Sequence, residues 1–287
     1  MYKKLERLNQ ISNQYDAFLI DAWGVLHDGA SVFSHAYECL KSLKKQSKSV
    51  VIISNAARRS SEFDLELAAS GIYSSMFDFS LSSGELFWQN AKSGKYAALG
   101  KSCYYLGPER SKGILYDLEL DLVNSLEAAD FIMNTGAEGN LPDVSSFLSL
   151  LKEAANKQLP MICANPDLAA IRKGVRGISA GAIAKQYQQM GGEVEYIGKP
   201  HTQIYKHCLS KLADVPESRI LMIGDGLQTD ILGANKIGID SVFIRDGIYA
   251  EQIKLAKSHL NSEKAVYENL FKSESAKPDF MIDKLVF

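Results

Sequence analysis

Short runs of apolar residues recur along the chain and alternate with longer stretches of helical periodicity. Each run is rich in Ile, Val, Leu, Met or Phe. The runs cover residues 17–20, 50–53, 131–133, 161–163, 220–223 and 241–244. Continuous apolar runs of this length are typical of strands that are buried on both faces of a sheet.

The helical stretches lie between these runs. They cover residues 63–69, 144–155, 181–190 and 202–212. Strands that alternate with helices form parallel sheets, because each crossover between parallel strands usually passes through a helix. We therefore expect an α/β protein with a Rossmann-like parallel sheet, and residues 278–283 resemble a final strand that returns to it.

The middle third of the chain repeats the alternation of strands and helices with different polar ends. Asn134-Thr135-Gly136 follows one strand, and Asn165-Pro166-Asp167 follows another. A chain of 287 residues is long enough for two domains. We interpret the middle third as a second α/β domain, residues 100–195, inserted into a core domain of residues 1–99 and 196–287.

Composition excludes several classes of protein. Hydrophobic residues make up 46% of the chain and charged residues 23%, and the net charge of −2 provides no basic surface for nucleic acid or membrane. The lysines of residues 41–48, and Arg58 with Arg59, are expected on solvated helix faces. The four cysteines are far apart and form no CxxC pair, and the N-terminus lacks an apolar signal segment. No apolar run is long enough to span a membrane, so we expect a cytoplasmic protein.

Three of the apolar runs end in side chains that are suited to chemistry. The first stops at Asp21, the second at Ser54 and Asn55, and the run that closes with Gly224 stops at Asp225. Ligands of open parallel sheets bind at the carboxyl ends of the strands. We therefore expect these side chains to meet in one place.

Two of these strand ends carry carboxylates. Asp21 precedes Gly24, which suits a tight reversal, and Asp225 precedes a glycine-rich turn that leads to Asp230. Close carboxylates repel each other unless a proton or cation lies between them, and Mg²⁺ prefers carboxylate, water and phosphate oxygens. The pair is a candidate Mg²⁺ site. A solvated aspartate at a loop start, and an Asp230 that only begins a helix, are the alternatives.

Two further segments suit a phosphate group. A hydroxyl and backbone N–H groups near a helix start, as at Ser54 and Asn55, bind phosphate, although Ser54 could instead be a helix N-cap. Pro200 could open a helix and project Lys199 just before it, where the ammonium group would hold a phosphate. A lone surface lysine without function is the alternative for Lys199.

In their order and spacing, these motifs resemble motifs I to IV of the haloacid dehalogenase superfamily. They are Asp21-x-x-Gly24-Val25-Leu26, Ser54-Asn55, Gly198-Lys199-Pro200 and Gly224-Asp225-x-x-x-Thr229-Asp230. The segments Ala164-Asn165-Pro166-Asp167 and Ala180-Gly181-Ala182 are similar to the class IIA cap of NagD-like and p-nitrophenyl phosphatase-like members. The resemblance covers the chain from about Tyr15 to Ile282 and implies a Rossmann-like core with an inserted α/β class IIA cap.

The resemblance also implies a role for each residue of the motifs. Asp21 would be the nucleophile that forms an aspartyl-phosphate, and Ser54 and Lys199 would hold the transferring phosphoryl group, with Asn55 beside them. Mg²⁺ would be bound by Asp21, the backbone carbonyl of Trp23, Asp225 and Asp230. In the cap, Asn165 and Asp167 would contact the substrate, or would instead shape a turn.

Position 23 departs from the pattern of the phosphatases in this superfamily. These enzymes have a second Asp there, which protonates the leaving oxygen and then activates water, whereas this chain has Trp23. An indole does neither at neutral pH, and loss of a general acid–base costs about 10²–10⁴-fold in rate. His27, Asp28 or a cap residue could replace it, or the substrate could have a good leaving group, or Trp23 could only pack against the cap.

The resulting expectation is a Mg²⁺-dependent phosphatase of a small phosphorylated metabolite such as a sugar phosphate. Trp23 keeps a second hypothesis open, namely a phosphate-ligand binding or regulatory protein with weak turnover. Carbon–halogen hydrolysis is a third, because haloacid dehalogenases have an aromatic residue at this position, although they lack this cap and Mg²⁺. Some relatives pair through the cap, so a homodimer is compatible with the resemblance.

Overall fold

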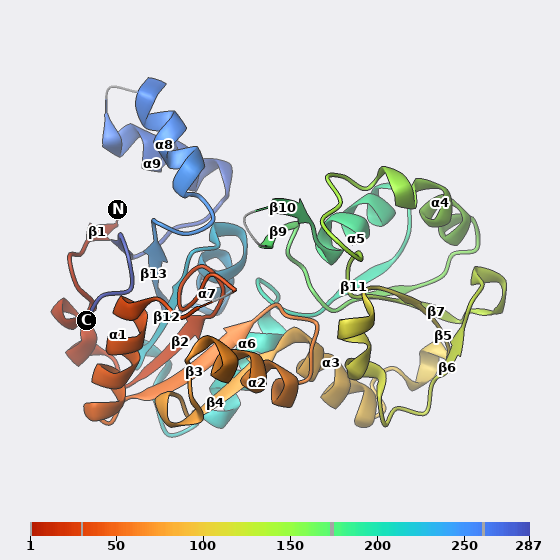
Figure 1. The fold of residues 1–287 in the computed structure, drawn as a ribbon, viewed down its shortest axis with the longest axis horizontal. Helices are drawn as coiled ribbons and strands as arrows, with labels where there is room; N and C mark the ends of the chain where they lie inside the picture. Colours follow the sequence, from red (N-terminus) through yellow and green to blue (C-terminus); the bar gives the residue numbers. More distant parts are fainter. Residues whose placement is uncertain (1, 30, 173–174, 260–261) are drawn as a thin grey trace. The chain divides into compact units, whose positions relative to one another are not determined.

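The computed structural model describes residues 2–29, 31–172, 175–259 and 262–287. Contacts between Cα atoms divide the chain into two compact units (Figure 1). The first unit is Met1–Ser54, Asp64–Leu81 and Tyr205–Phe287, and the second is Asn55–Phe63 and Ser82–Ile204. This division assigns the Gly198-Lys199-Pro200 motif to the second unit, and the domain boundaries at residues 99 and 195 stay a prediction.

The first unit is built on a seven-stranded sheet in the order β1-β14-β13-β12-β2-β3-β4. Parallel pairing joins β2 to β12 and to β3, and β12 to β13. The strands are β1 (Lys3–Lys4), β2 (Ala17–Asp21), β3 (Ser49–Ser54), β4 (Phe79–Ser82), β12 (Ile220–Gly224), β13 (Asp240–Ile244) and β14 (Phe280–Ile282). The strands predicted at residues 17–20, 50–53, 220–223 and 241–244 are confirmed, as is the parallel α/β fold class.

The central strands are buried along their whole length and are apolar up to Asp21 at the end of β2. Every residue of β2 and β12 is buried. The helix α1 (Ser34–Lys45) buries Ala36, Cys39, Leu40 and Leu43, which lie on one face at helical spacing. Lys41 and Lys45 are exposed on α1, as the sequence predicts for this positively charged run. The prediction is wrong for Lys48, which follows the helix, has a largely buried side chain and donates to the carbonyl of Tyr15 at 2.7 Å.

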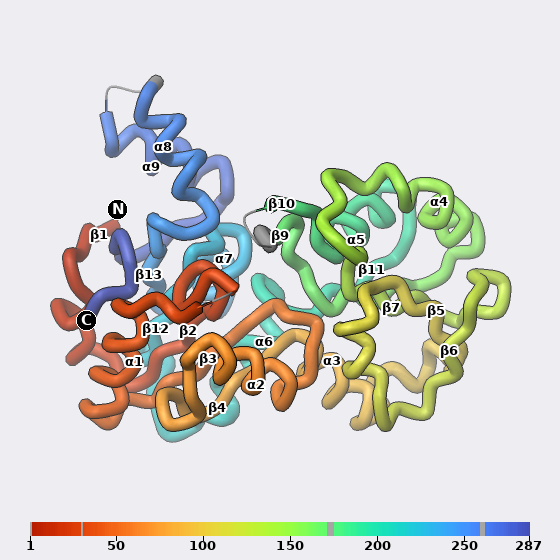
Figure 2. The backbone as a smooth tube through the Cα atoms, viewed as in Figure 1, coloured from red at the N-terminus to blue at the C-terminus, as the bar shows by residue number. Residues whose placement is uncertain are grey.

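Two C-terminal helices pack beside the edge of the first sheet. They are α8 (Ala250–His259) and α9 (Glu263–Ser273). Residues of α9 share a buried cluster with Phe243 of β13, Met281 of β14 and Leu227. The N-terminal and C-terminal segments both lie in this unit (Figure 2), and they meet where the N–H of Leu8 donates to the carbonyl of Val286 at 2.7 Å.

The second unit is built on a five-stranded sheet in the order β11-β8-β7-β5-β6, in which every neighbouring pair is parallel. The strands are β5 (Ser102–Leu106), β6 (Asp121–Val123), β7 (Phe131–Asn134), β8 (Met161–Cys163) and β11 (Val194–Tyr196). The helices are α3 (Ser83–Lys92), α4 (Leu148–Asn156) and α5 (Ala180–Gln189), and β9 (Ala169–Arg172) pairs antiparallel with β10 (Val175–Ile178). The strands predicted at residues 131–133 and 161–163 are confirmed.

Two helices continue from the second unit into the first, namely α2 (Ser60–Ser70) and α6 (Thr202–Lys211). Three predictions about the residues that precede these helices are wrong. Arg58 and Arg59 precede α2, and Arg59 pairs with Glu85 at 2.7 Å and lies over the Trp88 ring instead of on a solvated face. Ser54 is too far from α2 to be its N-cap. Pro200 does not open α6, because the N–H of His201 donates to the Gly198 carbonyl in a turn before Thr202.

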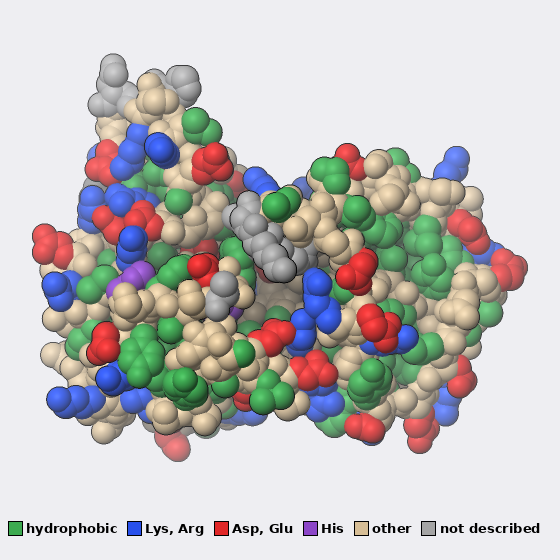
Figure 3. All heavy atoms as spheres, viewed as in Figure 1, with side chains coloured by type: hydrophobic (Ala, Val, Ile, Leu, Met, Phe, Trp, Pro, Cys, Tyr) green, Lys and Arg blue, Asp and Glu red, His purple; other side chains and the backbone are tan. Residues whose placement is uncertain are grey.

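Surface charge and thiol chemistry agree with the composition. Figure 3 shows acidic and basic side chains intermixed over the face in view. All four cysteines are free and buried, and burial raises the pKa of the Cys103 and Cys163 thiols to about 12. Among the described residues, none of the helices has both the length and the apolar character that a membrane span requires.

Tyr205 connects α6 to the segment that follows β12, and we expect its hydroxyl to stabilise the first unit. The buried hydroxyl donates to the carbonyl of Thr229 at 3.0 Å. Tyr205→Phe removes this bond and the longer one to the Asp230 carbonyl at 3.4 Å, and the Thr229 carbonyl then keeps only the N–H of Leu232 as a donor. The free energy of unfolding should therefore fall by about 1 kcal/mol in urea denaturation. Tyr73→Phe, at an exposed tyrosine, is the control and should change it by less than about 0.5 kcal/mol. Equal losses in the two variants would contradict this role.

Candidate active site

Three aspartates of the first unit form a buried acidic cluster. Asp21 is the last residue of β2, and Asp225 directly follows β12, the neighbouring strand. Asp230 lies in the turn after Asp225. Each offers one carboxylate oxygen, and these oxygens lie within 4.8 Å of one another. The side chains are only 8%, 4% and 0% exposed, respectively.

The loop after Asp21 approaches Asp225 so closely that only glycine fits. Gly24 has a φ of +81°, a conformation that residues with a Cβ rarely adopt. A Cβ at this position would lie 2.2 Å from the nearer Asp225 carboxylate oxygen. The N–H of Gly24 donates to the carbonyl of His27 at 2.9 Å, which closes the reversal. The tight turn predicted at Gly24 is therefore present, and it brings the loop backbone against the cluster.

A second loop, which the sequence did not single out, reaches Asp225 from β13. The backbone N–H of Ile248 donates to one carboxylate oxygen of Asp225 at 2.8 Å. A Cβ at Gly247 would lie 2.2 Å from the Cβ of Asp225. The signal that could have found this loop is the Asp246-Gly247 pair just after the run at residues 241–244, because β13 ends at the same edge of the sheet as β12.

Asp230 is held by the backbone at the start of its own helix. Leu227–Ile231 form a π-helical turn that continues into α7 (Leu232–Ile237), so the helix begins at Leu227 and not at Asp230. The N–H of Gly226 donates to the Asp230 carboxylate at 2.9 Å. The side chain thus satisfies one of the free N–H groups at the helix start while it faces the other two aspartates.

The negative charge of the acidic cluster affects the pKa of a nearby tyrosine, Tyr249. Burial raises the pKa of the Tyr249 hydroxyl, and the charges of Glu274, Asp225 and Asp230 raise it further. Tyr249 therefore stays a neutral phenol at any physiological pH. It follows Ile248 directly, so the loop after β13 contributes both a hydrogen-bond donor to Asp225 and a neutral side chain near the cluster.

The residues of the cluster fit a hard divalent cation. Three carboxylates in a buried space repel one another strongly, and a cation or protons must offset that repulsion. All three donors are oxygens, and the cluster includes no histidine or cysteine that would favour zinc. The donor set matches Mg²⁺, which binds through a few carboxylates and keeps positions for water and phosphate oxygens.

The loop that contains Trp23 continues into a small flap. Backbone bridges join Trp23 to His27 and His27 to Val32. The indole of Trp23 is half-buried and lies against Gly29, where a Cβ would be 3.0 Å from the indole nitrogen. Asp28 is exposed, and one of its carboxylate oxygens accepts from the N–H of Ser31 at 2.9 Å. Asp28 therefore caps a turn of the flap.

His27 is held as a neutral imidazole. It is only 9% exposed, and its Nδ1 accepts a hydrogen bond from the N–H of Gly29 at 3.0 Å. Nδ1 therefore has no proton, and the single proton of the neutral ring is on Nε2. Burial lowers the pKa of His27, although the charge of Asp28 opposes this shift. The flap thus holds His27 in the form that is a poor proton donor.

The phosphate-motif residues lie at the end of β3 and in the second unit. Ser54 is the buried last residue of β3. Asn55, the next residue, donates from Nδ2 to the Lys199 carbonyl at 3.0 Å and accepts from the Lys199 N–H at 2.7 Å. Asn55 Nδ2 also donates to Asp167 at 2.7 Å. Lys199 is 2% exposed, so it is not the lone surface lysine of the alternative reading, and its function stays a prediction.

Asn165 shapes the turn in which it lies. Its side-chain carbonyl accepts from the N–H of Asp167 at 3.0 Å, and its amide donates to Ser179 at 3.0 Å. The Asp167 carbonyl in turn accepts from the N–H of Gly181. These bonds favour the structural alternative for Asn165, and substrate contact by Asn165 or Asp167 stays a prediction.

The structure therefore brings the site residues together in two groups. Asp21, Asp225 and Asp230 form the acidic cluster of the first unit, and Asn55, Lys199 and Asp167 form a hydrogen-bonded group in the second. Their chemical roles, like that of the Trp23 carbonyl and of Ser54, stay predictions. The sequence did not point to Gly247, Ile248 and Tyr249.

Comparisons with known proteins agree with this geometry. A family model described as haloacid dehalogenase-like hydrolase matches residues 15–238, and a second hydrolase-like model matches residues 196–285. The fold is similar to that of a haloacid dehalogenase-like hydrolase from Brucella suis 1330, with a TM-score of 0.84 and 29% identity over 98% of this chain and 100% of the other.

Two curated proteins are similar over most of their length. Chronophin from Mus musculus is 24% identical over 261 residues, which cover 84% of each chain. 5′-Nucleotidase YutF from Bacillus subtilis is 24% identical over 240 residues, which cover 82% of this chain and 88% of that protein.

The four motifs, the buried acidic cluster at the strand ends and these similarities lead to one conclusion. The chain belongs to the haloacid dehalogenase-like hydrolase family, in its class IIA.

Proposed function

We propose that this hydrolase is a Mg²⁺-dependent phosphatase of a small phosphorylated metabolite. The observation that supports it most is the acidic cluster, in which a strand-end aspartate lies beside two further buried carboxylates. A nucleophilic carboxylate next to a cation-binding pair is the arrangement that phosphoryl transfer through an aspartyl-phosphate requires. The name of the related 5′-nucleotidase is consistent with this substrate class.

The reaction would proceed in two steps at Asp21. In the first, a carboxylate oxygen of Asp21 attacks the phosphorus in line, the bond to the ester oxygen breaks, and the alcohol leaves with the bonding electron pair. In the second, water attacks the aspartyl-phosphate, releases inorganic phosphate and restores the Asp21 carboxylate. Each step needs a proton transfer, because the leaving oxygen gains a proton in the first and water loses one in the second.

Asp21, Asp225 and Asp230 would hold Mg²⁺, with the Trp23 carbonyl as a further ligand. The cation, when bound, offsets the charge of the cluster and orients the phosphoryl group. Gly24 and the N–H of Ile248 fix the Asp225 carboxylate from two sides. The chain itself therefore supplies preorganised acidic ligands in a space from which most water is excluded.

Ser54 and Lys199 would hold the oxygens of the transferring phosphoryl group. Asn55 supports this role, because its two hydrogen bonds fix the backbone of Lys199. Lys199 is buried, and a buried ammonium group is a strong electrostatic partner for phosphate. In this proposal Asn55 is a positioning residue and does not itself react. The buried, reduced cysteines are consistent with a cytoplasmic setting.

A second candidate function, binding of a phosphorylated ligand with weak turnover, is supported by the flap. The indole of Trp23 neither gives up nor takes up a proton at neutral pH, His27 is held neutral, and Asp28 caps a turn. The flap thus lacks an evident general acid. A phosphatase with this flap would act best on esters whose leaving oxygen needs little protonation.

Replacement of Asp21 tests the nucleophile. In the presence of Mg²⁺, Asp21→Asn should lower the rate of p-nitrophenyl phosphate hydrolysis by roughly 10³-fold or more, because the amide cannot form the acyl-phosphate. Phosphate release is measured with the purified protein, before and after removal of divalent cations with EDTA. EDTA should abolish the wild-type rate, and added Mg²⁺ should restore it.

The matched control for this experiment is Asp214→Asn, at an exposed aspartate of the first unit outside the acidic cluster. It removes one negative charge without touching the cluster and should keep the wild-type rate within about threefold. Hydrolysis that persists in Asp21→Asn, or that is insensitive to EDTA, would exclude the proposed mechanism.

A variant that restores the missing acid tests whether proton transfer limits the hydrolysis rate of the wild-type protein. Trp23→Asp should raise the hydrolysis rate of an alkyl phosphate such as glycerol phosphate by about 10²–10⁴-fold, because an alkoxide needs a proton to leave. The gain for p-nitrophenyl phosphate should be much smaller, since its leaving group is stable as an anion. Trp23→Phe, which supplies no acid, should give no gain. Equal gains on both substrates would rule out leaving-group protonation as the limiting step.

The lowered pKa of His27 predicts a loss of stability on acidification. The folded protein holds His27 neutral, whereas the unfolded chain binds a proton near pH 6.5. The unfolding free energy should therefore fall as pH drops below 6.5 towards the folded pKa, and stay level above 6.5 as far as His27 is concerned. His27→Asn keeps an acceptor for Gly29 but does not titrate. In urea denaturation at pH 7.5 and 5.5, the variant should lose less stability than the wild type, and an equal loss would count against a buried neutral His27.

A further inference from the structure

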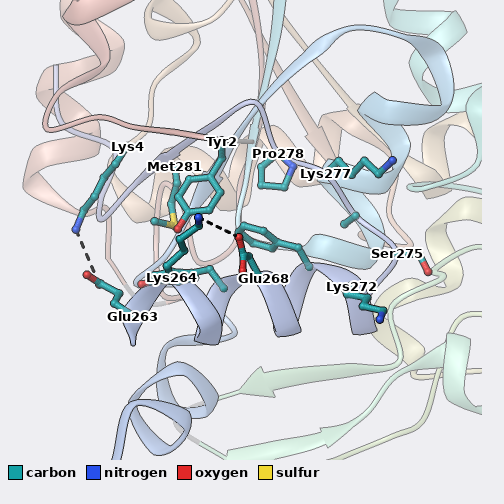
Figure 4. Close-up of a pocket in the computed structure, with 13 residues that line it drawn as sticks. Tyr2, Lys4, Glu263, Lys264, Glu268, Lys272, Ser275, Lys277, Pro278 and Met281 are labelled. Carbon is teal, nitrogen blue, oxygen red and sulfur yellow. Dashed lines mark ion pairs between the residues drawn. The ribbon is translucent and has the colours of Figure 1, made fainter. Parts of the chain in front are cut away.

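Apart from the acidic cluster, a cavity lies in the first unit between the N-terminal segment, α9 and the approach to β14 (Figure 4). Its volume is about 950 Å³, which is within the range of small-molecule sites. None of its lining residues belongs to the acidic cluster. The aromatic side chains Tyr2, Tyr267 and Phe271 line it together with Met281. The proposed phosphatase mechanism leaves this cavity without a role.

The apolar part of the cavity is built from aromatic rings. The ring of Tyr2 meets those of Tyr267 and Phe271 edge to face, with centroids 6.0 Å and 5.4 Å away. Tyr267 and Phe271 belong to the buried cluster that continues to Phe243, and Tyr2 packs against this cluster. Tyr2 is only half-buried, so part of its side chain stays open to a ligand. Aromatic rings in this arrangement favour another planar ring beside them.

The charged part of the cavity has an excess of lysines. Figure 4 shows Lys4 paired with Glu263 and Lys264 paired with Glu268, at 3.9 Å and 3.7 Å. Lys272 and Lys277 lie towards the other end of the cavity, near Ser275. Both are exposed, and among the described residues neither has a carboxylate within 4.0 Å. Two cations thus remain available to an anion at this end.

We propose that this cavity binds a small anion that carries an aromatic ring, of which a nucleotide is the ordinary cellular example. The ring packs beside Tyr2 and Phe271, and the anionic group is bound by Lys272 and Lys277. The separation of the apolar and cationic parts along α9 matches a ligand with one planar end and one charged end. The limited volume favours a small molecule over a protein partner.

The test uses ADP as the probe and isothermal titration calorimetry as the measurement. Titrations contain EDTA, so that hydrolysis and metal-dependent binding at the acidic cluster do not occur. ADP should bind the wild-type protein with a Kd below 1 mM, and the Lys272→Ala, Lys277→Ala double variant should bind it roughly tenfold or more weakly. Lys254→Ala, at an exposed lysine of α8 outside the cavity, should bind like the wild type.

Two probes separate recognition of the ring from recognition of the charge. Pyrophosphate has the anion alone, adenosine has the ring alone, and each should bind at least about tenfold more weakly than ADP. Pyrophosphate binding as tight as that of ADP would overturn the aromatic part of the proposal. Absence of ADP binding, or equal binding to the double variant, would overturn the whole proposal.

The experiment also separates this site from the proposed phosphatase site. The double variant should hydrolyse p-nitrophenyl phosphate at the wild-type rate, and Asp21→Asn should keep the wild-type affinity for ADP. Loss of ADP binding in Asp21→Asn would assign the binding to the acidic cluster and overturn the proposal. Failure of the phosphatase assay in the wild-type protein would contradict the proposed function and leave the binding result unaffected.

Discussion

The repulsion between three buried carboxylates is the constraint on which the rest of the site depends. Asp21, Asp225 and Asp230 place oxygens within 4.8 Å of one another in a space with little water. In a low-dielectric environment this arrangement is strongly unfavourable unless a cation offsets it. The backbone around the cluster maintains the close approach, because the N–H groups of Gly226 and Ile248 bind two of the carboxylates. A divalent cation between the three carboxylates would replace this repulsion with attraction, so its binding would stabilise their close arrangement.

Small residues make this approach sterically feasible. A Cβ at Gly24, Gly224 or Gly247 would lie 2.2 Å from an atom of Asp225 or Asp230. Three loops, after β2, β12 and β13, therefore pack their backbones directly against the acidic side chains. Because these strands are neighbours in one parallel sheet, the loops that follow them meet at one edge. Hydrophobic packing also holds Asp230 in place. Leu227 and Ile231, on either side of Asp230 in the chain, belong to the same buried hydrophobic cluster as Tyr267 and Phe271, which line the cavity beside Tyr2.

The sequence predicts those features of the fold and site that depend on local pattern. The apolar runs that end at Asp21 and Asp225 identify buried strands, and the parallel topology then places their ends together. The sequence does not reveal contacts that depend on how distant segments pack. The Ile248 N–H becomes a donor to Asp225 only because β13 lies beside β12. The same applies to Arg59, which precedes α2 and whose partner Glu85 lies in α3, and to the cavity beside Tyr2, which exists only where the N-terminal segment meets α9.

With Trp23 at this position, the flap has no side chain that could readily protonate the leaving oxygen of a substrate. The indole lies against Gly29, whose N–H at the same time holds Nδ1 of His27 as an acceptor. One glycine thus positions both side chains, and neither is left as a proton donor at neutral pH. The nearest carboxyl group of the flap, Asp28, caps a turn and is exposed. A hydrolase with this flap has its candidate nucleophile, Asp21, and its candidate cation ligands, but the loop itself has no evident group to protonate a leaving alkoxide. In the proposed phosphatase, efficient turnover would therefore require either a stable leaving group or a proton supplied from outside the flap, and residue 23 would select between substrates by the basicity of the oxygen that departs.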